Sequence, residues 1–172
     1  MHTTTKLGLG VLFGISLAGF TLWWLADHRR GMGWAVRVVR HRFPDVSHLS
    51  VIELDAWLRD KQRRTPKVVD VRSEEEFATS HLPNALHLSS EATAAKALSI
   101  LDRESPIVLY CSAGYRGATL ARRLKAAGCT DVWNLEGGIF AWSNAGLALE
   151  RAGKKTRLVH PYSRFFKRFL KR

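Results

Sequence analysis

Between residues 45 and 150, short apolar runs alternate with stretches of helical periodicity. The apolar runs predict strands over residues 48–49, 68–71, 85–88, 107–110 and 132–135. The stretches between them predict helices that open at Ser50 and Ser73 and that span residues 91–101, 117–127 and 138–144. Strands and helices that alternate at this spacing are typical of a parallel sheet with helices on both faces. We therefore predict an α/β fold with three layers, α/β/α, around about five parallel strands.

Two of the predicted helices carry a start signal in the sequence. Ser50 stands three residues before Glu53, and Ser73 stands three residues before Glu76. In this capping-box pattern the serine and the glutamate each accept a hydrogen bond from the other's backbone N–H group. Both helix starts are thus predicted from local sequence.

Residues 7–26 show a different pattern, with twenty consecutive uncharged and mostly apolar residues. A helix of that length spans roughly 30 Å, which is enough to cross a bilayer core. Trp23 and Trp24 near its end suit a membrane interface. A cleaved signal peptide and a buried core helix are the alternatives. The run is longer than the roughly 7–15 apolar residues of a signal peptide and is apolar on every face, so we predict a transmembrane helix.

The remaining segments follow from this prediction. Residues 1–6 form an N-terminal tip, 27–44 a juxtamembrane linker, 45–150 the folded domain and 151–172 a basic tail. The linker is predicted to be helical over 33–43 and to end at Pro44. Five arginines follow the apolar run and one lysine precedes it, which predicts a single-pass membrane protein with its domain on the cytoplasmic side.

The formal net charge of +12 is uneven along the chain. Residues 1–42 carry +5, residues 43–150 carry −2 and residues 151–172 carry +9. A nucleic-acid-binding domain carries its positive charge on the folded face, so we expect no nucleic-acid partner. The tail at 160–172 places Tyr162, Phe165, Phe166 and Phe169 on one helical stripe, opposite basic residues. It is predicted to be an amphipathic helix that contacts lipid, with a disordered basic tail as the alternative.

One cysteine lies where chemistry is expected. The apolar run 107–110 ends at Cys111, and Arg116 follows after four residues, close to the start of a predicted helix. Reactive groups in parallel sheets lie at the carboxyl ends of strands. Backbone N–H groups, the helix dipole and Arg116 together favour a thiolate there. Gly114 and Gly117 permit backbone angles that other residues resist. An inert buried cysteine is the alternative.

Four motifs in order resemble the rhodanese (thiosulfate sulfurtransferase) family over roughly residues 47–150. They are Val68-Val69-Asp70-Val71-Arg72, the stretch from Glu75-Glu76-Phe77 to Ser80-His81-Leu82-Pro83-Asn84-Ala85, the loop 111–117, and Leu135-Glu136-Gly137-Gly138-Ile139-Phe140-Ala141-Trp142. Ser80 and Asn84 replace glycines that are usual in the family. The resemblance implies a rhodanese-like fold and a sulfurtransferase activity.

The resemblance implies a role for each loop residue. Cys111 is expected to be the catalytic nucleophile, which takes sulfane sulfur from a donor such as thiosulfate and passes it to a thiol or cyanide. The expected substrate-binding residues are Ser112, Ala113, Gly114, Tyr115, Arg116 and Gly117. Their N–H groups are expected to hold the persulfide, and Arg116 is expected to orient the anionic donor with both guanidinium arms.

Four further polar residues are expected to support the site. Asp70, Arg72, Glu76 and His81 belong to the framework near the active face, with a buried ion pair between Arg72 and Glu76 and a hydrogen bond from His81 at the turn before Pro83. Neither a metal nor a cofactor is expected, because the histidines lack ligand spacing. Cys129 is expected to pack at a helix-to-strand turn, and the number of subunits is not predicted.

Two other functions fit parts of the sequence. A phosphatase or arsenate reductase of the Cys-loop-Arg type places five residues between cysteine and arginine, whereas four separate Cys111 from Arg116. The shorter loop makes a tighter cradle, suited to a sulfur atom rather than to a tetrahedral phosphate. A non-catalytic binding or sensor module with the same fold is the second alternative, against which the intact thiol and the glycine-rich loop argue.

Overall fold

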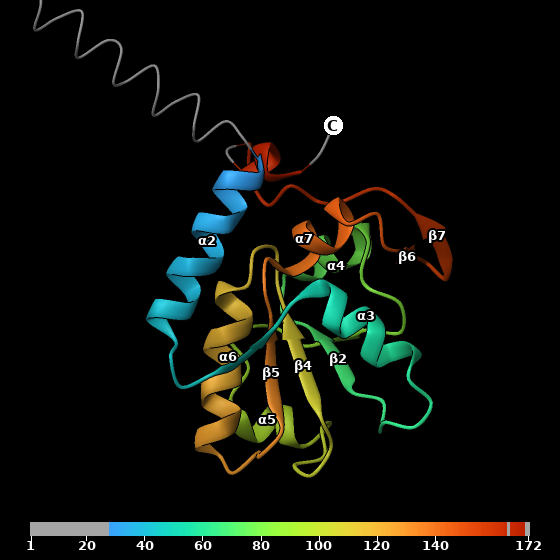
Figure 1. Cartoon of the computed structure of the whole chain (residues 1–172). Helices are drawn as coiled ribbons and strands as arrows, with labels where there is room; N and C mark the ends of the chain where they lie inside the picture. Colours follow the sequence, from blue (N-terminus) through green and yellow to red (C-terminus); the bar gives the residue numbers. More distant parts are fainter. Residues whose placement is uncertain (1–27, 165, 171–172) are drawn as a thin grey trace, which may run out of the picture.

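A single parallel sheet forms the centre of the molecule (Figure 1). The computed structural model describes residues 28–164 and 166–170 of the 172. The five strands lie in the order β1-β5-β4-β2-β3, and all neighbours run parallel. Their bounds are β1 (Ser47–Leu49), β2 (Lys67–Asp70), β3 (Leu86–His87), β4 (Ile107–Tyr110) and β5 (Val132–Leu135). The predicted α/β fold with five parallel strands is confirmed.

Helices cover both faces of the sheet. Successive strand residues point to opposite faces, and in β4 Leu109 belongs to one apolar cluster and Val108 to the other. The Leu109 cluster includes residues of α5 (Ala94–Leu98) and α6 (Tyr115–Ala126), and the Val108 cluster includes residues of α3 (Val51–Arg59) and α7 (Gly138–Asn144). Strand β4 is buried along its whole length, so the centre of the sheet is shielded from solvent.

Helix starts are where the sequence was most informative. Both predicted capping boxes are present, Ser50 with Glu53 at the start of α3 and Ser73 with Glu76 at the start of α4 (Glu74–Thr79). The predicted strand over 85–88 is reduced to the two residues of β3, and the predicted helix over 91–101 to α5. A cap fixes a helix start locally, whereas the length of an edge element depends on its tertiary neighbours.

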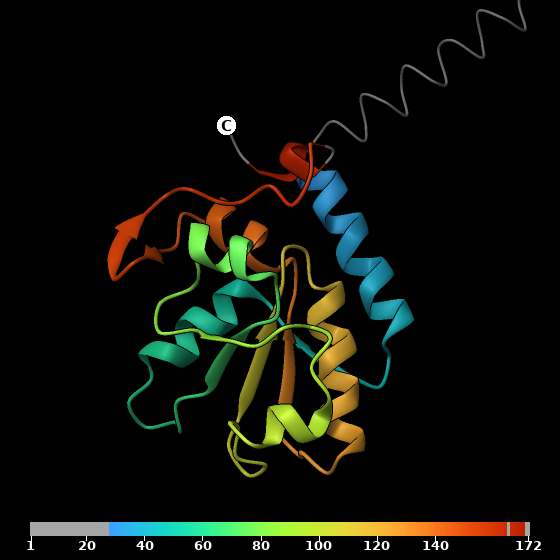
Figure 2. The same ribbon diagram turned by 180° about the vertical axis from the view of Figure 1, so that it is seen from behind.

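The N-terminal helix packs on the domain rather than standing apart from it. It is α2 (His28–Arg42), and its Val39, together with Phe43 just beyond it, is buried in the cluster that also holds Leu124 of α6. Figures 1 and 2 show α2 lying beside α6 from both sides. The predicted helicity of residues 33–43 is confirmed to Arg42.

The localisation expected from the sequence requires correction. Within residues 28–164 and 166–170, no helix has both the length and the apolar character needed to cross a membrane. The single-pass membrane localisation, with the domain on the cytoplasmic side, is overturned by this finding. The predicted tip at 1–6 and the predicted spanning segment at 7–26 lie outside the described residues.

The C-terminal tail differs from the predicted amphipathic helix over 160–172. From residue 149 the chain forms an antiparallel hairpin, β6 (Leu149–Arg151) with β7 (Lys154–Thr156), then an irregular stretch and the short 3-10 helix η1 (Phe166–Phe169). Tyr162 has a φ of 61°, which interrupts any helix there. Phe169 is buried in the α3 and α7 cluster, against which Phe166 packs. The aromatic side chains described here therefore contact the domain. Phe165 lies outside the described residues.

Candidate active site

Cys111 stands directly after β4, the central strand, and its side chain is 3% exposed. The main chain at this point is held by the opposite helix, because Ile139 N donates to Cys111 O (2.9 Å) and Phe140 N donates to Ser112 O (3.2 Å). The start of α7 thus fixes the start of the loop. This contact allows the thiol little freedom of position.

The loop closes onto the N-terminus of α6 within three residues. Gly114 is the N-cap of α6 with a φ of 103°, and its N–H donates to Cys111 Sγ at 3.1 Å. The N–H groups of the next residues lie in the first turn of the helix, where no intrahelical acceptor exists. The sulfur therefore faces a helix N-terminus, which favours negative charge.

Two glycines let neighbouring groups approach closely at the loop. A Cβ on Gly138 would lie 2.0 Å from Cys111 O, and one on Gly117 would lie 2.5 Å from Asn134 Oδ1. Gly138 also has a φ of 51°, which side chains resist. Neither site has room for a larger residue.

Glu76 links the loop to α4. Arg116 donates to Glu76 through both arms, Nη1 to Oε2 (2.8 Å) and Nη2 to Oε1 (2.9 Å), and Nη2 also donates to Ser112 Oγ (2.9 Å). Ser112 Oγ in turn donates to Glu76 Oε1 at 2.8 Å. Bidentate pairs of this type are among the strongest polar contacts in proteins. Arg116 is thereby held in one place.

The electrostatics of this pair follow from its burial and its hydrogen bonds. Burial alone favours a neutral Glu76, but hydrogen bonds from Arg116, Ser112 and the Ser73 backbone outweigh it and lower the pKa of Glu76 to about 2. Burial also opposes the charge of Arg116, yet its contacts with Glu76 and Cys111 raise the pKa of Arg116. A fixed positive charge therefore lies close to the sulfur.

A family model described as a rhodanese-like domain matches residues 50–145 of the chain. The chain belongs to the rhodanese-like domain family. The match begins at the cap of α3 and ends after α7, so it contains Cys111, its loop and the Glu76 network.

Several curated relatives carry the name thiosulfate sulfurtransferase GlpE. The protein of Coxiella burnetii strain RSA 331 is 31% identical over 100 residues, covering 58% of this chain and 87% of the relative. That of Vibrio cholerae strain ATCC 39541 is 27% identical over 103 residues, covering 60% of this chain and 93% of the relative. Among solved structures, a rhodanese-like domain protein from Staphylococcus aureus is 30% identical with a TM-score of 0.54, over 62% of this chain and 98% of that one.

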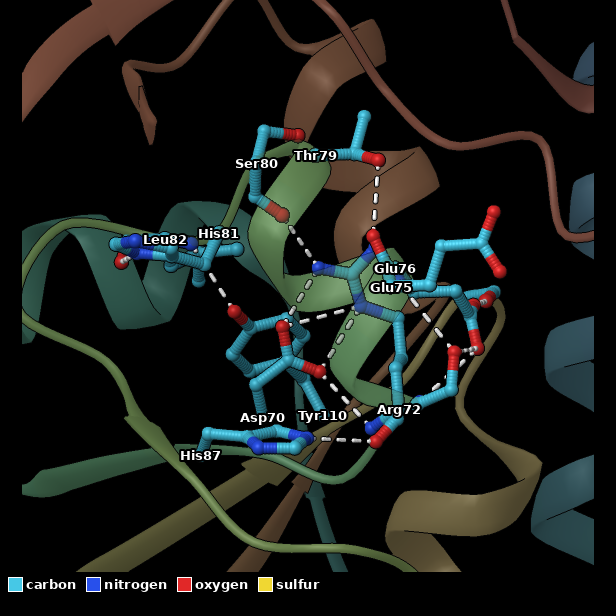
Figure 3. A network of polar contacts seen from close by, with 12 residues as sticks. Asp70, Arg72, Glu75, Glu76, Thr79, Ser80, His81, Leu82, His87 and Tyr110 are labelled. Atoms are coloured by element: carbon cyan, nitrogen blue, oxygen red, sulfur yellow. Dashed lines mark hydrogen bonds and ion pairs between the residues drawn. The ribbon is translucent and has the colours of Figure 1, made fainter. Parts of the chain in front are cut away.

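The ion pairs of the rhodanese-like domain differ from the expected one. Arg72 pairs with Asp70, both fully buried, and Glu76 pairs with Arg116 instead of with Arg72. Figure 3 shows the Arg72 guanidinium between the Asp70 carboxylate and the backbone oxygen of Ser80, to which Nη2 donates. Asp70 is the last residue of β2, and Arg72, two residues later, lies on the same side of the chain. Arg72 therefore pairs with Asp70, and Glu76 is available to pair with Arg116 of the loop.

The expected hydrogen bond at His81 is present. His81 Nδ1 lies 3.0 Å from Leu82 O, and the ring stacks on Phe77. Tyr110 Oη accepts from Leu82 N at 3.0 Å, and burial raises the pKa of this tyrosine well above its usual value. These contacts attach the turn after α4 to the end of β4 (Figure 3).

Two features of the site were missed in the sequence. His87 Nε2 contacts Arg72 O at 2.9 Å, and Tyr162 from the tail lies over Arg116, with the guanidinium carbon 4.9 Å from the ring centroid. Tyr162 follows the matched family region, and the sequence pattern placed it only on the aromatic stripe of the tail, with no link to Arg116. Cys129 is buried, and burial raises the pKa of its thiol.

Metal binding finds no support in the part of the chain that the structure describes. Within residues 28–164 and 166–170, no three side chains of the histidine, cysteine, aspartate or glutamate types are grouped so as to hold an ion. The side chains of Glu76, Ser112 and Arg116 beside the loop bind one another.

Proposed function

We propose that the protein is a sulfurtransferase that carries sulfane sulfur on Cys111. The observation that carries the proposal is the contact between Cys111 Sγ and the N–H of Gly114 at the N-terminus of α6. The name of the Coxiella and Vibrio relatives, thiosulfate sulfurtransferase, supports the same activity. A thiolate is the nucleophile in sulfur exchange, and this position favours one.

In the first step the Cys111 thiolate attacks the outer sulfur of a donor such as thiosulfate. A bond forms between Sγ and the outer sulfur, the bond between the two donor sulfurs breaks, and sulfite leaves with the electron pair. The product is a Cys111 persulfide whose terminal sulfur is negative. N–H groups in the first turn of α6 stabilise that charge as an oxyanion hole stabilises oxygen.

In the second step a thiolate or cyanide attacks the terminal sulfur. The bond between this sulfur and Sγ breaks, and the thiolate of Cys111 is regenerated with the electron pair. The acceptor leaves as a persulfide or as thiocyanate. No acid or base is needed, because every leaving group is already an anion.

Arg116 acts in this proposal as a fixed charge rather than as a donor clamp. Both of its arms are occupied by Glu76 and Ser112. A guanidinium held in this way attracts an anionic donor without a bidentate contact to it. Its role is to lower the energy of the negative sulfur beside it.

The proposal is tested by thiocyanate formation from thiosulfate and cyanide. The protein is expected to turn over, Cys111→Ser to be inactive, and Cys129→Ser to keep full activity as the matched control. Hydrolysis of an aryl phosphate without thiocyanate formation would instead indicate phosphatase chemistry. If the folded wild-type protein formed neither thiocyanate nor phosphate with any sulfane donor or aryl phosphate, the proposed enzymatic activity would be refuted.

A further inference from the structure

The C-terminal tail reaches the candidate active site, although it lies beyond the family region. After β7 the chain crosses the end of the sheet where α4 and α7 lie, as both views show (Figures 1 and 2). The tail is fastened at both ends of this crossing. Ser80 Oγ donates to Leu158 O at 2.6 Å, and Asn144 Nδ2 donates to Phe169 O at 2.6 Å. The stretch between these two contacts carries Tyr162.

Tyr162 is placed by a constrained turn. Its φ of 61° lies in the left-handed region. For any residue other than glycine this conformation is unfavourable in free energy, and it occurs mostly where the surrounding structure enforces it. The turn is closed by hydrogen bonds from Tyr162 N to His160 Nδ1 (3.1 Å) and from Ser163 N to Pro161 O (2.6 Å). The turn therefore holds Tyr162 in a defined position relative to the rest of the tail.

A chain of aromatic contacts connects Tyr162 with the cysteine loop. The Tyr162 ring packs edge-on against Phe166 at 5.3 Å, and Phe166 lies 6.5 Å from the ring of Phe140. The N–H of Phe140 donates to Ser112 O in the loop. The position of the tyrosine ring is therefore tied to the loop that holds Cys111.

The ring covers the open face of Arg116. Glu76 and Ser112 bind the edges of the guanidinium, while the Tyr162 ring lies 4.9 Å from its carbon. A cation over an aromatic face is attracted by the ring quadrupole. About half of the Tyr162 side chain remains exposed, and 26% of Arg116. The tyrosine thus lies between the guanidinium and solvent.

We propose that Tyr162 is a positioning residue, which holds the Arg116 charge beside Cys111 and so tunes the reactivity of this thiol toward anionic reagents. The inference rests on the proposed function only in taking Cys111 as the reactive thiol. Without the ring, Glu76 and Ser112 still bind the edges of the guanidinium. Its face is then open to water, so the guanidinium can shift and solvent screens its charge at the sulfur. Residues outside the family region would accordingly shape the preference of the site for anionic sulfur compounds.

The test compares two alkylating reagents at one pH. Iodoacetate is an anion and iodoacetamide is neutral, and both react with the thiolate, so the ratio of their rates reports the charge near Cys111 independently of the thiolate fraction. In a Cys129→Ser background, Tyr162→Ala is expected to lower this ratio by up to about fourfold, the factor for one full charge acting across ~5 Å in water. Tyr162→Phe, which keeps the ring, is expected to retain the wild-type ratio.

Two controls separate positioning from a loss of structure. Tyr162→Leu keeps apolar bulk against Phe166 but lacks the aromatic face, and is expected to lower the ratio like the alanine variant. Leu158→Ala changes an exposed side chain of the same tail and is expected to leave the ratio unchanged. A wild-type ratio in folded Tyr162→Ala or Tyr162→Leu, or a reduced ratio in Tyr162→Phe, would overturn the inference. Because alkylation needs no sulfur donor, these outcomes are independent of whether sulfur transfer occurs.

Discussion

At the scale of single residues, Glu76 connects two parts of the site, helix α4 and the cysteine loop. It closes the capping box of α4 with Ser73, and it binds Arg116 and Ser112 of the loop. The capping role was predictable because both partners lie within four residues. The pairing with Arg116 was not, since forty residues separate them and the sequence pattern offered Arg72 as a nearer partner.

The depressed pKa of Glu76 predicts a pH dependence of stability. The carboxyl titrates at about 2 in the folded protein against an ordinary value of 4.5, which corresponds to about 3 kcal/mol. A depressed folded pKa means that this contribution is complete above pH 4.5 and is lost as the pH falls toward 2. Urea unfolding between pH 7 and pH 2.5 is expected to show a smaller pH-dependent loss in Glu76→Gln than in the wild type.

Glu75 provides the control for this measurement. Its side chain is 85% exposed on the same helix, so Glu75→Gln is expected to follow the wild-type pH profile. At pH 7, Glu76→Gln is expected to cost roughly 2–4 kcal/mol, because a charged Arg116 loses its partner. Parallel pH profiles for Glu76→Gln and the wild type would contradict the assigned ion pair.

At the scale of elements, the close approach of α7 to the cysteine loop is the contact that fixes the main chain at Cys111 and Ser112. Residue spacing predicted both elements, and the motif from Leu135 to Trp142 contained the necessary glycine. Spacing did not show that the helix start would donate two N–H groups to the loop main chain, because this depends on how the strands pair. The sequence similarly predicted the full length of β4, but it overestimated the length of β3, which lies at the edge of the sheet.

A methyl group at Gly138 is predicted to disrupt the site. Its Cβ would lie 2.0 Å from Cys111 O, so Gly138→Ala is expected to cost more than about 3 kcal/mol and to abolish sulfur transfer. Gly146→Ala is the matched control, because its φ of 75° is also positive but nothing lies within 4 Å of the added atom. That variant is expected to cost about 1 kcal/mol. Equal losses in thermal unfolding of the two variants would contradict the close approach.

At the scale of the whole molecule, the N-terminal helix α2 and the C-terminal tail both pack on the rhodanese-like domain. Residues of α2 and η1 contact each other, and both elements contribute side chains to the buried clusters. In the sequence, the positive charge is concentrated in these two flanking segments, and the aromatic stripe of the tail predicted an amphipathic helix. The described residues show packing instead, because Phe166 and Phe169 find partners on α7 that a local pattern does not reveal.

Removing the aromatic anchor of the tail is therefore predicted to destabilise the domain. Phe169 is 7% exposed and packs within the α3 and α7 cluster. Phe169→Ala is expected to lower the free energy of unfolding by about 3 kcal/mol. Ile52→Ala, at a side chain that is 63% exposed, is expected to change it by less than about 0.5 kcal/mol. A loss at Phe169 no larger than that at Ile52 would show that the tail does not stabilise the fold.

The central claim is that Cys111 carries sulfur as a persulfide, and intact-protein mass spectrometry tests it most directly. After incubation with thiosulfate, the protein is expected to gain about 32 Da, the mass of one sulfur atom, at Cys111. Cyanide is expected to remove this mass and release thiocyanate, Cys129→Ser is expected to behave like the wild type, and Cys111→Ser is expected to gain nothing. An unmodified Cys111 after incubation of the folded protein with thiosulfate and with other sulfane donors would contradict the claim.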